Sequence, residues 1–149
     1  MAPLAERLAA ARAFANEPGF GDPRIKVTDI ERELGTRYTV DTLAALQQRF
    51  PAIRFVWLMG ADNLLQIPRW RNWRAVFRAV PVAIFPRPTY SMRALAGKAA
   101  RRFARHRIRE FRAPRLADMR PPVWVFLHAE NDPQSATRIR AQRRADAHE

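Results

Sequence analysis

Residues 55–73 read FVWLMGADNLLQIPRWRNW and contain the strongest strand and turn pattern of the chain. The run Phe55–Met59 is apolar and stops at Gly60, after which apolar residues recur with helical spacing over 64–67. This pattern predicts a buried strand that ends in a tight turn and leads into a helix. In a parallel α/β sheet, ligands bind at the carboxyl ends of the strands. Gly60 and Asp62 are therefore expected where a backbone group or a carboxylate can meet a ribose or a phosphate.

A purely structural interpretation of the same residues stays open. Asp62 is a good N-cap residue for the helix that follows the turn. Trp70 and Trp73 come directly after that helix, and large aromatic side chains are common in protein cores. On this interpretation, the stretch contributes packing and a helix cap but no ligand site.

Strands and helices alternate along the rest of the chain. Strands are predicted near Ile25–Thr28, Phe55–Met59, Val82–Phe85 and Val123–Leu127. Helices are predicted from Thr39 to Pro51, over Trp73–Ala79 and Met92–Arg107, and from Ser135 onward, with an irregular loop over Arg109–Pro122. The later strands are continuous apolar runs, which is typical of a parallel sheet covered on both faces. We expect one α/β domain over residues 1–149.

Composition narrows the class of protein. The chain has 149 residues, 48% of them hydrophobic, which suits one domain with a substantial core. The absence of cysteine excludes disulfides and thiolate metal sites and favours a reducing, cytoplasmic compartment. No apolar run approaches the roughly 20 residues that span a bilayer, so we expect no membrane association. The three histidines stand apart from one another, and we expect no protein-bound metal.

The net charge is +13, and all but two of the 27 basic residues are arginine. This excess favours anionic ligands, which include both nucleotides and nucleic acids. No RNP, helix-turn-helix or zinc-finger pattern accompanies the arginine clusters, so we do not expect nucleic acid as the partner. A nucleic-acid-binding module without enzymatic activity remains the alternative hypothesis. The positions of five arginines separate the two hypotheses, and these are Arg101, Arg102, Arg105, Arg109 and Arg112.

The segment after the last strand offers groups that suit a phosphate. Ser135 and Thr137 lie at a predicted helix start, where hydroxyls, free backbone N–H groups and the positive end of the helix dipole converge. Arg140 follows one turn later on the same side. Serine and threonine at a helix start are also common as simple caps, so this signal alone does not decide between the two roles.

Several of these segments together resemble bacterial nicotinate-nucleotide adenylyltransferase, in the same order and at similar spacing. The matching segments are YTVDTL at 38–43, WLMGADNL at 57–64, PRW at 68–70 with Trp73, VP at 80–81, RP at 87–88 and SATRIR at 135–140. The resemblance implies a Rossmann-like nucleotidyltransferase fold. It also implies a reaction that joins ATP and nicotinate mononucleotide to give deamido-NAD and pyrophosphate, with Mg²⁺ carried by ATP.

The resemblance also implies roles for individual residues. Trp70 would stack on the nicotinate ring, and Tyr38, Thr39 and the backbone around Arg71 would frame the ring and its carboxylate. The ATP-binding residues would be Gly60 and Asp62 for the ribose, and Ser135, Thr137 and Arg140 for the phosphates. Arg140 is also the residue that would act in catalysis, and Arg87 would be a further phosphate contact.

One feature of the family is missing from this sequence. The family has a first strand followed by a glycine-rich turn and an H-x-G-H motif, and these 149 residues contain neither. The sequence from Met1 resembles the family well downstream of that motif. We therefore expect an N-terminally incomplete form of the fold with impaired activity. Such a form could also bind nucleotide without turnover.

Overall fold

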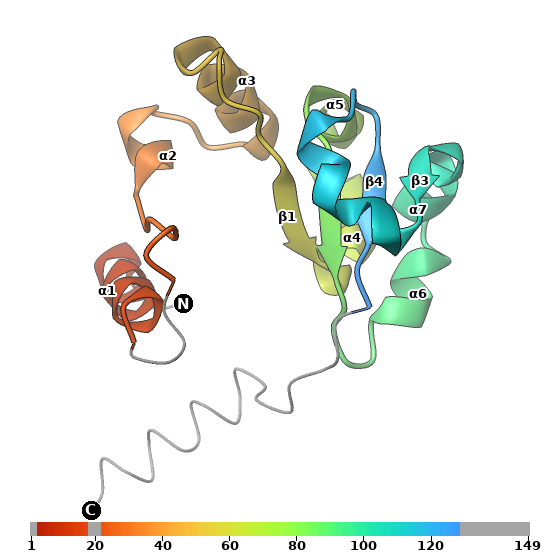
Figure 1. Cartoon of the computed structure of the whole chain (residues 1–149), viewed down its shortest axis with the longest axis horizontal. Helices are drawn as coiled ribbons and strands as arrows, with labels where there is room; N and C mark the ends of the chain where they lie inside the picture. Colours follow the sequence, from red (N-terminus) through yellow and green to blue (C-terminus); the bar gives the residue numbers. More distant parts are fainter. Residues whose placement is uncertain (1–2, 18–21, 129–149) are drawn as a thin grey trace, which may run out of the picture.

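The computed structural model describes residues 3–17 and 22–128 and shows an α/β fold (Figure 1). Its α-helices are α1 (Leu4–Ala15), α2 (Ile30–Glu33), α3 (Thr39–Arg49), α4 (Ala61–Gln66), α5 (Trp73–Ala79), α6 (Ser91–Leu95) and α7 (Lys98–Arg102). Three 3₁₀ helices are η1 (Ile67–Arg69), η2 (Ala104–His106) and η3 (Glu110–Asp118). The strands are β1 (Trp57–Gly60), β2 (Val82–Phe85), β3 (Arg107–Ile108) and β4 (Trp124–Phe126). The predicted α/β class is confirmed.

The four strands form one parallel sheet in the order β1-β2-β4-β3. The register pairs Gly60 with Phe85 and Ile84 with Phe126, so the carboxyl ends of β1, β2 and β4 lie at one edge. Three of the four predicted strands are therefore present, and their parallel arrangement is confirmed. Helix α5 has the predicted bounds as well.

The inner strands β2 and β4 are buried on both faces, which explains why they read as continuous apolar runs, whereas Leu58 of the edge strand β1 is 58% exposed. Val82 and Ile84 of β2 belong to the larger core, which includes Leu64 of α4 and Phe77 of α5. The intervening Ala83 faces a second, smaller core beneath η3, with Val125 and Leu116 among its members. Alternation along the strands thus divides apolar side chains between two cores.

Aromatic residues join the helices to the sheet within the larger core. The rings of Phe77 and Phe103 are stacked, with centroids 4.4 Å apart, and Trp73 meets Phe103 edge-on at 5.9 Å. The indole N–H of Trp124 donates a hydrogen bond of 2.8 Å to the backbone carbonyl of Phe103. This bond satisfies the buried indole and fixes the end of α7 against β4.

The strand predicted near Ile25–Thr28 is wrong. These residues form no regular structure, and the side chain of Ile25 is 59% exposed. An apolar alternation becomes a strand only where a neighbouring strand completes its hydrogen bonds and a core covers its apolar side. Neither is present around this segment in the part of the chain that the structure describes.

The single long helix predicted over Met92–Arg107 is also wrong. The segment divides into α6 and α7 at Gly97, which is the N-cap of α7. A Cβ atom on Gly97 would lie 2.9 Å from the carbonyl oxygen of Ala94 and 3.4 Å from Cδ1 of Leu65. The tight contact is with the backbone carbonyl of Ala94, three residues earlier, whereas Leu65 of α4 lies at an ordinary van der Waals distance. Glycine therefore suits the local backbone at the break between α6 and α7.

The segment Arg109–Pro122, predicted as an irregular loop, contains the 3₁₀ helix η3. Leu116 of η3 is buried against the sheet. The short edge strand β3 precedes η3 and was not predicted. The helix predicted from Ser135 lies outside the described residues.

The first two helices stand apart from the sheet in Figure 1, on the side of β1. Phe14 of α1 is 55% exposed, and neither core includes a residue of α1 or α2. Within the described part of the chain, no helix combines the length and apolarity that a membrane span requires.

Candidate functional site

The turn after β1 brings Gly60 and Asp62 against Arg87, which lies two residues past the end of β2. The guanidinium Nε of Arg87 is 3.6 Å from Oδ1 of Asp62. A Cβ atom on Gly60 would lie 2.3 Å from that same oxygen and 2.9 Å from the same nitrogen. Glycine at position 60 thus allows the carboxylate and the guanidinium to approach each other over the turn.

One oxygen of the Asp62 carboxylate lacks a hydrogen-bond partner in the part of the chain that the structure describes. This atom, Oδ1, is buried. The 3.6 Å separation from Arg87 is an ion pair but is too long for a hydrogen bond. A buried acceptor without a partner is costly, and a hydroxyl group donated by a ligand would satisfy it. The arrangement suits a sugar hydroxyl.

The backbone at Arg87 is fixed by a local loop. The N–H of Arg87 donates to the hydroxyl of Ser91 at 3.2 Å, and that hydroxyl donates to the carbonyl of Arg87 at 3.1 Å. Thr89, between them, has a left-handed backbone conformation with φ of 67°. The Arg87 side chain itself is 58% exposed, so its guanidinium can meet both Asp62 and an anion in solvent.

A second group of predicted residues gathers around the start of α3. Tyr38 is the N-cap of α3, and Thr39 is its first helical residue. The guanidinium carbon of Arg71 lies 4.7 Å from the centre of the Tyr38 ring, and Nη1 of Arg71 is 3.9 Å from Oδ2 of Asp41. Arg71 is thus held between an aromatic face and a carboxylate.

Trp70 lies between these two groups along the chain. Its side chain is half-buried and packs against the larger core. Its backbone N–H donates a hydrogen bond of 2.9 Å to the backbone carbonyl of Ile67. Helices α4 and η1 run from Asp62 to Trp70 without a break. At the helical rise per residue, this path is roughly 12 Å long.

The sequence model of the cytidylyltransferase-like family matches residues 1–142. The chain belongs to the cytidylyltransferase-like family. Three curated relatives share the name "Probable nicotinate-nucleotide adenylyltransferase". The protein of Cereibacter sphaeroides is 48% identical over 94% of this chain and 71% of its own length. The protein of Gluconacetobacter diazotrophicus is 52% identical over 95% of this chain and 63% of its own length. That of Parvibaculum lavamentivorans is 49% identical over 94% of this chain and 67% of its own length.

These matches confirm the resemblance to nicotinate-nucleotide adenylyltransferases, and they place the chain in an enzyme family that transfers nucleotidyl groups. They also confirm the Rossmann-like character of the parallel sheet. The chain spans between 63% and 71% of the length of these three relatives.

The phosphate-binding residues expected from the family's last motif are Ser135, Thr137 and Arg140. All three lie outside the described residues. The described part of the expected site therefore consists of Gly60, Asp62 and Arg87, which we call the Asp62 group, and of the residues around Trp70.

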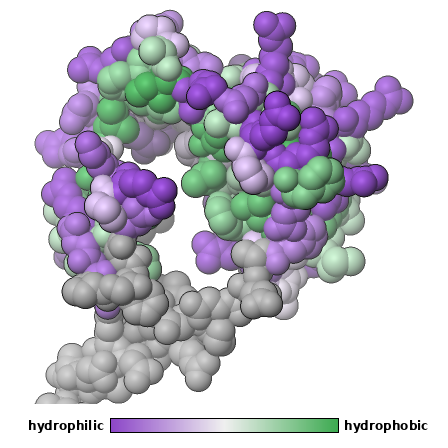
Figure 2. All heavy atoms as spheres, in the orientation of Figure 1, coloured by the Kyte–Doolittle hydropathy of each residue, from purple (hydrophilic) through white to green (hydrophobic). Residues whose placement is uncertain are grey.

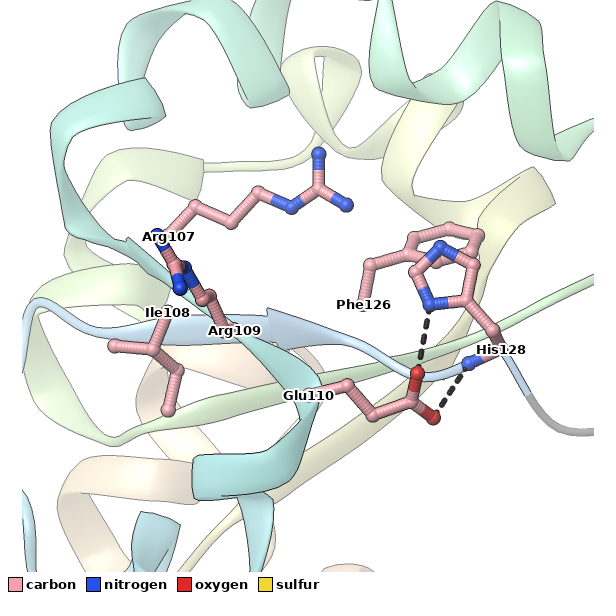
Figure 3. Close-up of a pocket in the computed structure, with 6 residues that line it drawn as sticks. All are labelled: Arg107, Ile108, Arg109, Glu110, Phe126 and His128. Carbon is pink, nitrogen blue, oxygen red and sulfur yellow. Dashed lines mark hydrogen bonds and ion pairs between the residues drawn. The ribbon is translucent and has the colours of Figure 1, made fainter.

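A cleft that the sequence did not predict lies at the carboxyl ends of β3 and β4, on the side of the sheet away from β1 (Figure 3). Its volume is about 330 Å³, and its lining residues are Arg107, Ile108, Arg109, Glu110, Phe126 and His128. Oε1 of Glu110 accepts the backbone N–H of His128, and Oε2 lies 2.8 Å from Nδ1 of the ring. These contacts, with the backbone N–H first, hold the pKa of Glu110 below its ordinary value. The available signal for this cleft was the triplet R-I-R at 107–109, which precedes the predicted strand Val123–Leu127 in the sequence.

Proposed function

We propose that the protein catalyses adenylyl transfer from ATP to nicotinate mononucleotide, giving deamido-NAD and pyrophosphate in cytoplasmic NAD biosynthesis. Family membership and the names of the relatives support this reaction. The observation in the structure that carries the proposal is the buried, unpartnered oxygen of Asp62 beside Arg87, at the carboxyl edge of a parallel sheet.

Different residues would bind each of the two substrates. Asp62 would accept a hydroxyl of the adenosine ribose, and Gly60 would let the sugar approach the backbone. Arg87 is close enough to the same turn to neutralise a phosphate. On the other side, the half-buried ring of Trp70 would stack on the nicotinate, while Arg71 would supply positive charge near its carboxylate. Tyr38 and Thr39 would frame the ring. Ser135, Thr137 and Arg140 complete the proposal as ATP phosphate contacts.

The chemistry requires alignment and charge neutralisation from the protein. A phosphate oxygen of nicotinate mononucleotide attacks the α-phosphorus of ATP in line. The bond from that phosphorus to the bridging oxygen of the β-phosphate breaks, and pyrophosphate leaves with the electron pair. Guanidinium groups around the phosphates stabilise the charge of the transition state. Mg²⁺ would arrive bound to ATP.

The 149 residues contain no H-x-G-H sequence. We therefore also propose that this chain alone forms deamido-NAD slowly. Loss of one preorganised donor typically costs on the order of 100- to 1000-fold in rate. The test is the formation of deamido-NAD from ATP and nicotinate mononucleotide, measured by chromatography and mass spectrometry. It is run on this chain and on a version carrying an upstream H-x-G-H segment.

Product formation by the longer version, with at least a 100-fold lower rate for the short chain, would support both parts of the proposal. Comparable turnover by the two lengths would remove the claim about the missing motif. Absence of product from both folded proteins would refute the reaction itself. Substitution of nicotinamide mononucleotide in the same assay reports the preference for the acid.

One observation favours the alternative of nucleic-acid binding. The arginines of α7, η2 and η3 are exposed beside β3, the sheet edge opposite β1. Figure 2 shows hydrophilic side chains projecting from this side of the molecule. Phe111 lies among the arginines and is 74% exposed, and exposed aromatics can stack on unpaired bases. Binding of a labelled single-stranded RNA that falls steeply with salt and is lost in Phe111→Ala would support this second function.

A further inference from the structure

We propose that the cleft lined by Arg107 and Arg109 is a second anion-binding site, which takes a phosphate-bearing ligand. The cleft opens where β3 and β4 end, at the same edge of the sheet as Gly60. β3 is the third strand from β1, so at the usual strand spacing the two places are about 14 Å apart. The cleft is therefore separate from the Asp62 group, and the proposal does not depend on the proposed function.

The charge of the cleft is the first argument. Arg107 and Arg109 both line it, and among the described residues no carboxylate lies within ion-pair distance of either. The single acidic residue of the lining is Glu110, whose two oxygens are engaged by His128. Two guanidinium groups thus face a concave surface without a compensating charge from this part of the chain, which favours a bound anion.

The second argument is that one of these cations is already positioned. The guanidinium carbon of Arg107 lies 5.4 Å from the centre of the Trp124 ring and 5.9 Å from that of Phe126. Figure 3 shows this side chain extended across the cleft toward Phe126 and His128. Contact with the aromatic faces restrains the side chain before any ligand binds, which lowers the entropic cost of binding.

The third argument concerns the chemical class of the ligand. The planar guanidinium fork matches the oxygens of a phosphate and binds them in a bidentate manner. A volume of about 330 Å³ lies at the lower end of the range for small-molecule sites. A phosphate or pyrophosphate group fits this space and leaves its organic part, where one is present, free to extend into solvent.

The experiment uses inorganic pyrophosphate as the probe, titrated into the chain by isothermal calorimetry. Arg109→Ala should weaken binding about tenfold, the scale of one lost charge-assisted contact. Glu110→Gln should strengthen binding, because it removes the negative charge and its amide oxygen can still accept the N–H of His128. Arg115→Ala is the matched control, because Arg115 is an exposed arginine of η3 that does not line the cleft. It should bind as the wild type does.

Two further arms separate other sources of binding. If Arg87→Ala abolishes pyrophosphate binding while Arg109→Ala leaves it unchanged, the probe binds at the Asp62 group and the proposal is overturned. Equal losses in Arg109→Ala and Arg115→Ala, together with competition by a single-stranded RNA, would assign the arginines to a diffuse nucleic-acid surface and also overturn it. Failure to form deamido-NAD in the earlier assay leaves the expected pyrophosphate results unchanged.

Discussion

The two ends of the carboxyl edge carry opposite chemistry on one sheet. At the β1 end, Asp62 faces Arg87, and one of its oxygens is buried without a hydrogen bond. At the β3 end, Arg107 and Arg109 line a cleft whose carboxylate is already engaged by a histidine. The first end offers an acceptor to a neutral hydroxyl beside one cation, whereas the second offers two cations. Strand ends at one side of a sheet can therefore select different ligand groups through the residues that follow each strand.

The largest expected effect comes from Gly60→Ala. The added methyl group would overlap Oδ1 of Asp62 and crowd Nε of Arg87, so both side chains must move away from the turn. We expect ATP binding to fall about 100-fold, the scale of two lost charge-assisted contacts, with little change in pyrophosphate binding at the cleft. Calorimetric titration of both ligands and a thermal melt check this. Unchanged ATP affinity in a folded variant would contradict the role of the turn.

A smaller effect is expected for Trp70→Ala. Loss of one aromatic platform should weaken binding of nicotinate mononucleotide by about 1–3 kcal/mol and change ATP binding much less. Phe111→Ala, which removes an exposed aromatic beside the cleft, is the matched control. Equal losses for the two substrates would show that Trp70 acts through folding, and would remove it from the site.

The smallest effect concerns pH and belongs to the β3 end. Because the pKa of Glu110 is lowered by the backbone N–H and ring of His128, the folded chain favours the ionised form. The contribution of this contact is fully present above the ordinary glutamate pKa and is lost as pH falls through the lowered value. Urea titrations across the acid range should show that Glu110→Gln lowers the free energy of unfolding near neutral pH but not in acid. A pH-independent difference would contradict this linkage.

The strands β1, β2 and β4 could be predicted because each is an apolar run bounded by turn residues. Helix α5 was predicted with the bounds that the structure shows. The strand expected at Ile25–Thr28 is not formed. A strand needs a neighbouring strand to pair with, and its own residues do not show whether one is available. The break at Gly97 was missed because an apolar periodicity continues across it, while the glycine sits against the backbone carbonyl of Ala94. Local pattern therefore predicts elements well only where it also reflects the core.

The same limit applies to the two ends of the carboxyl edge. Gly60 and Asp62 could be predicted as neighbours of a ligand because they directly follow a strong strand. The ion pair of Asp62 with Arg87 depends on the pairing of β1 with β2. The sequence pattern predicts both strands but not that they are neighbours in the sheet. The cleft was missed because β3 has only two residues and Glu110 contacts His128 across 18 positions of the chain.

The most direct test of the central claim is the affinity for ATP of Asp62→Asn compared with Asp118→Asn. Asp118 is an exposed aspartate that pairs with Arg54 near the end of η3, so its variant controls for the loss of one carboxylate. We expect Asp62→Asn to weaken ATP binding about tenfold or more, while Asp118→Asn binds as the wild type does. Equal ATP affinity for wild type and a folded Asp62→Asn would contradict the claim that the β1 end of the sheet binds the nucleotide.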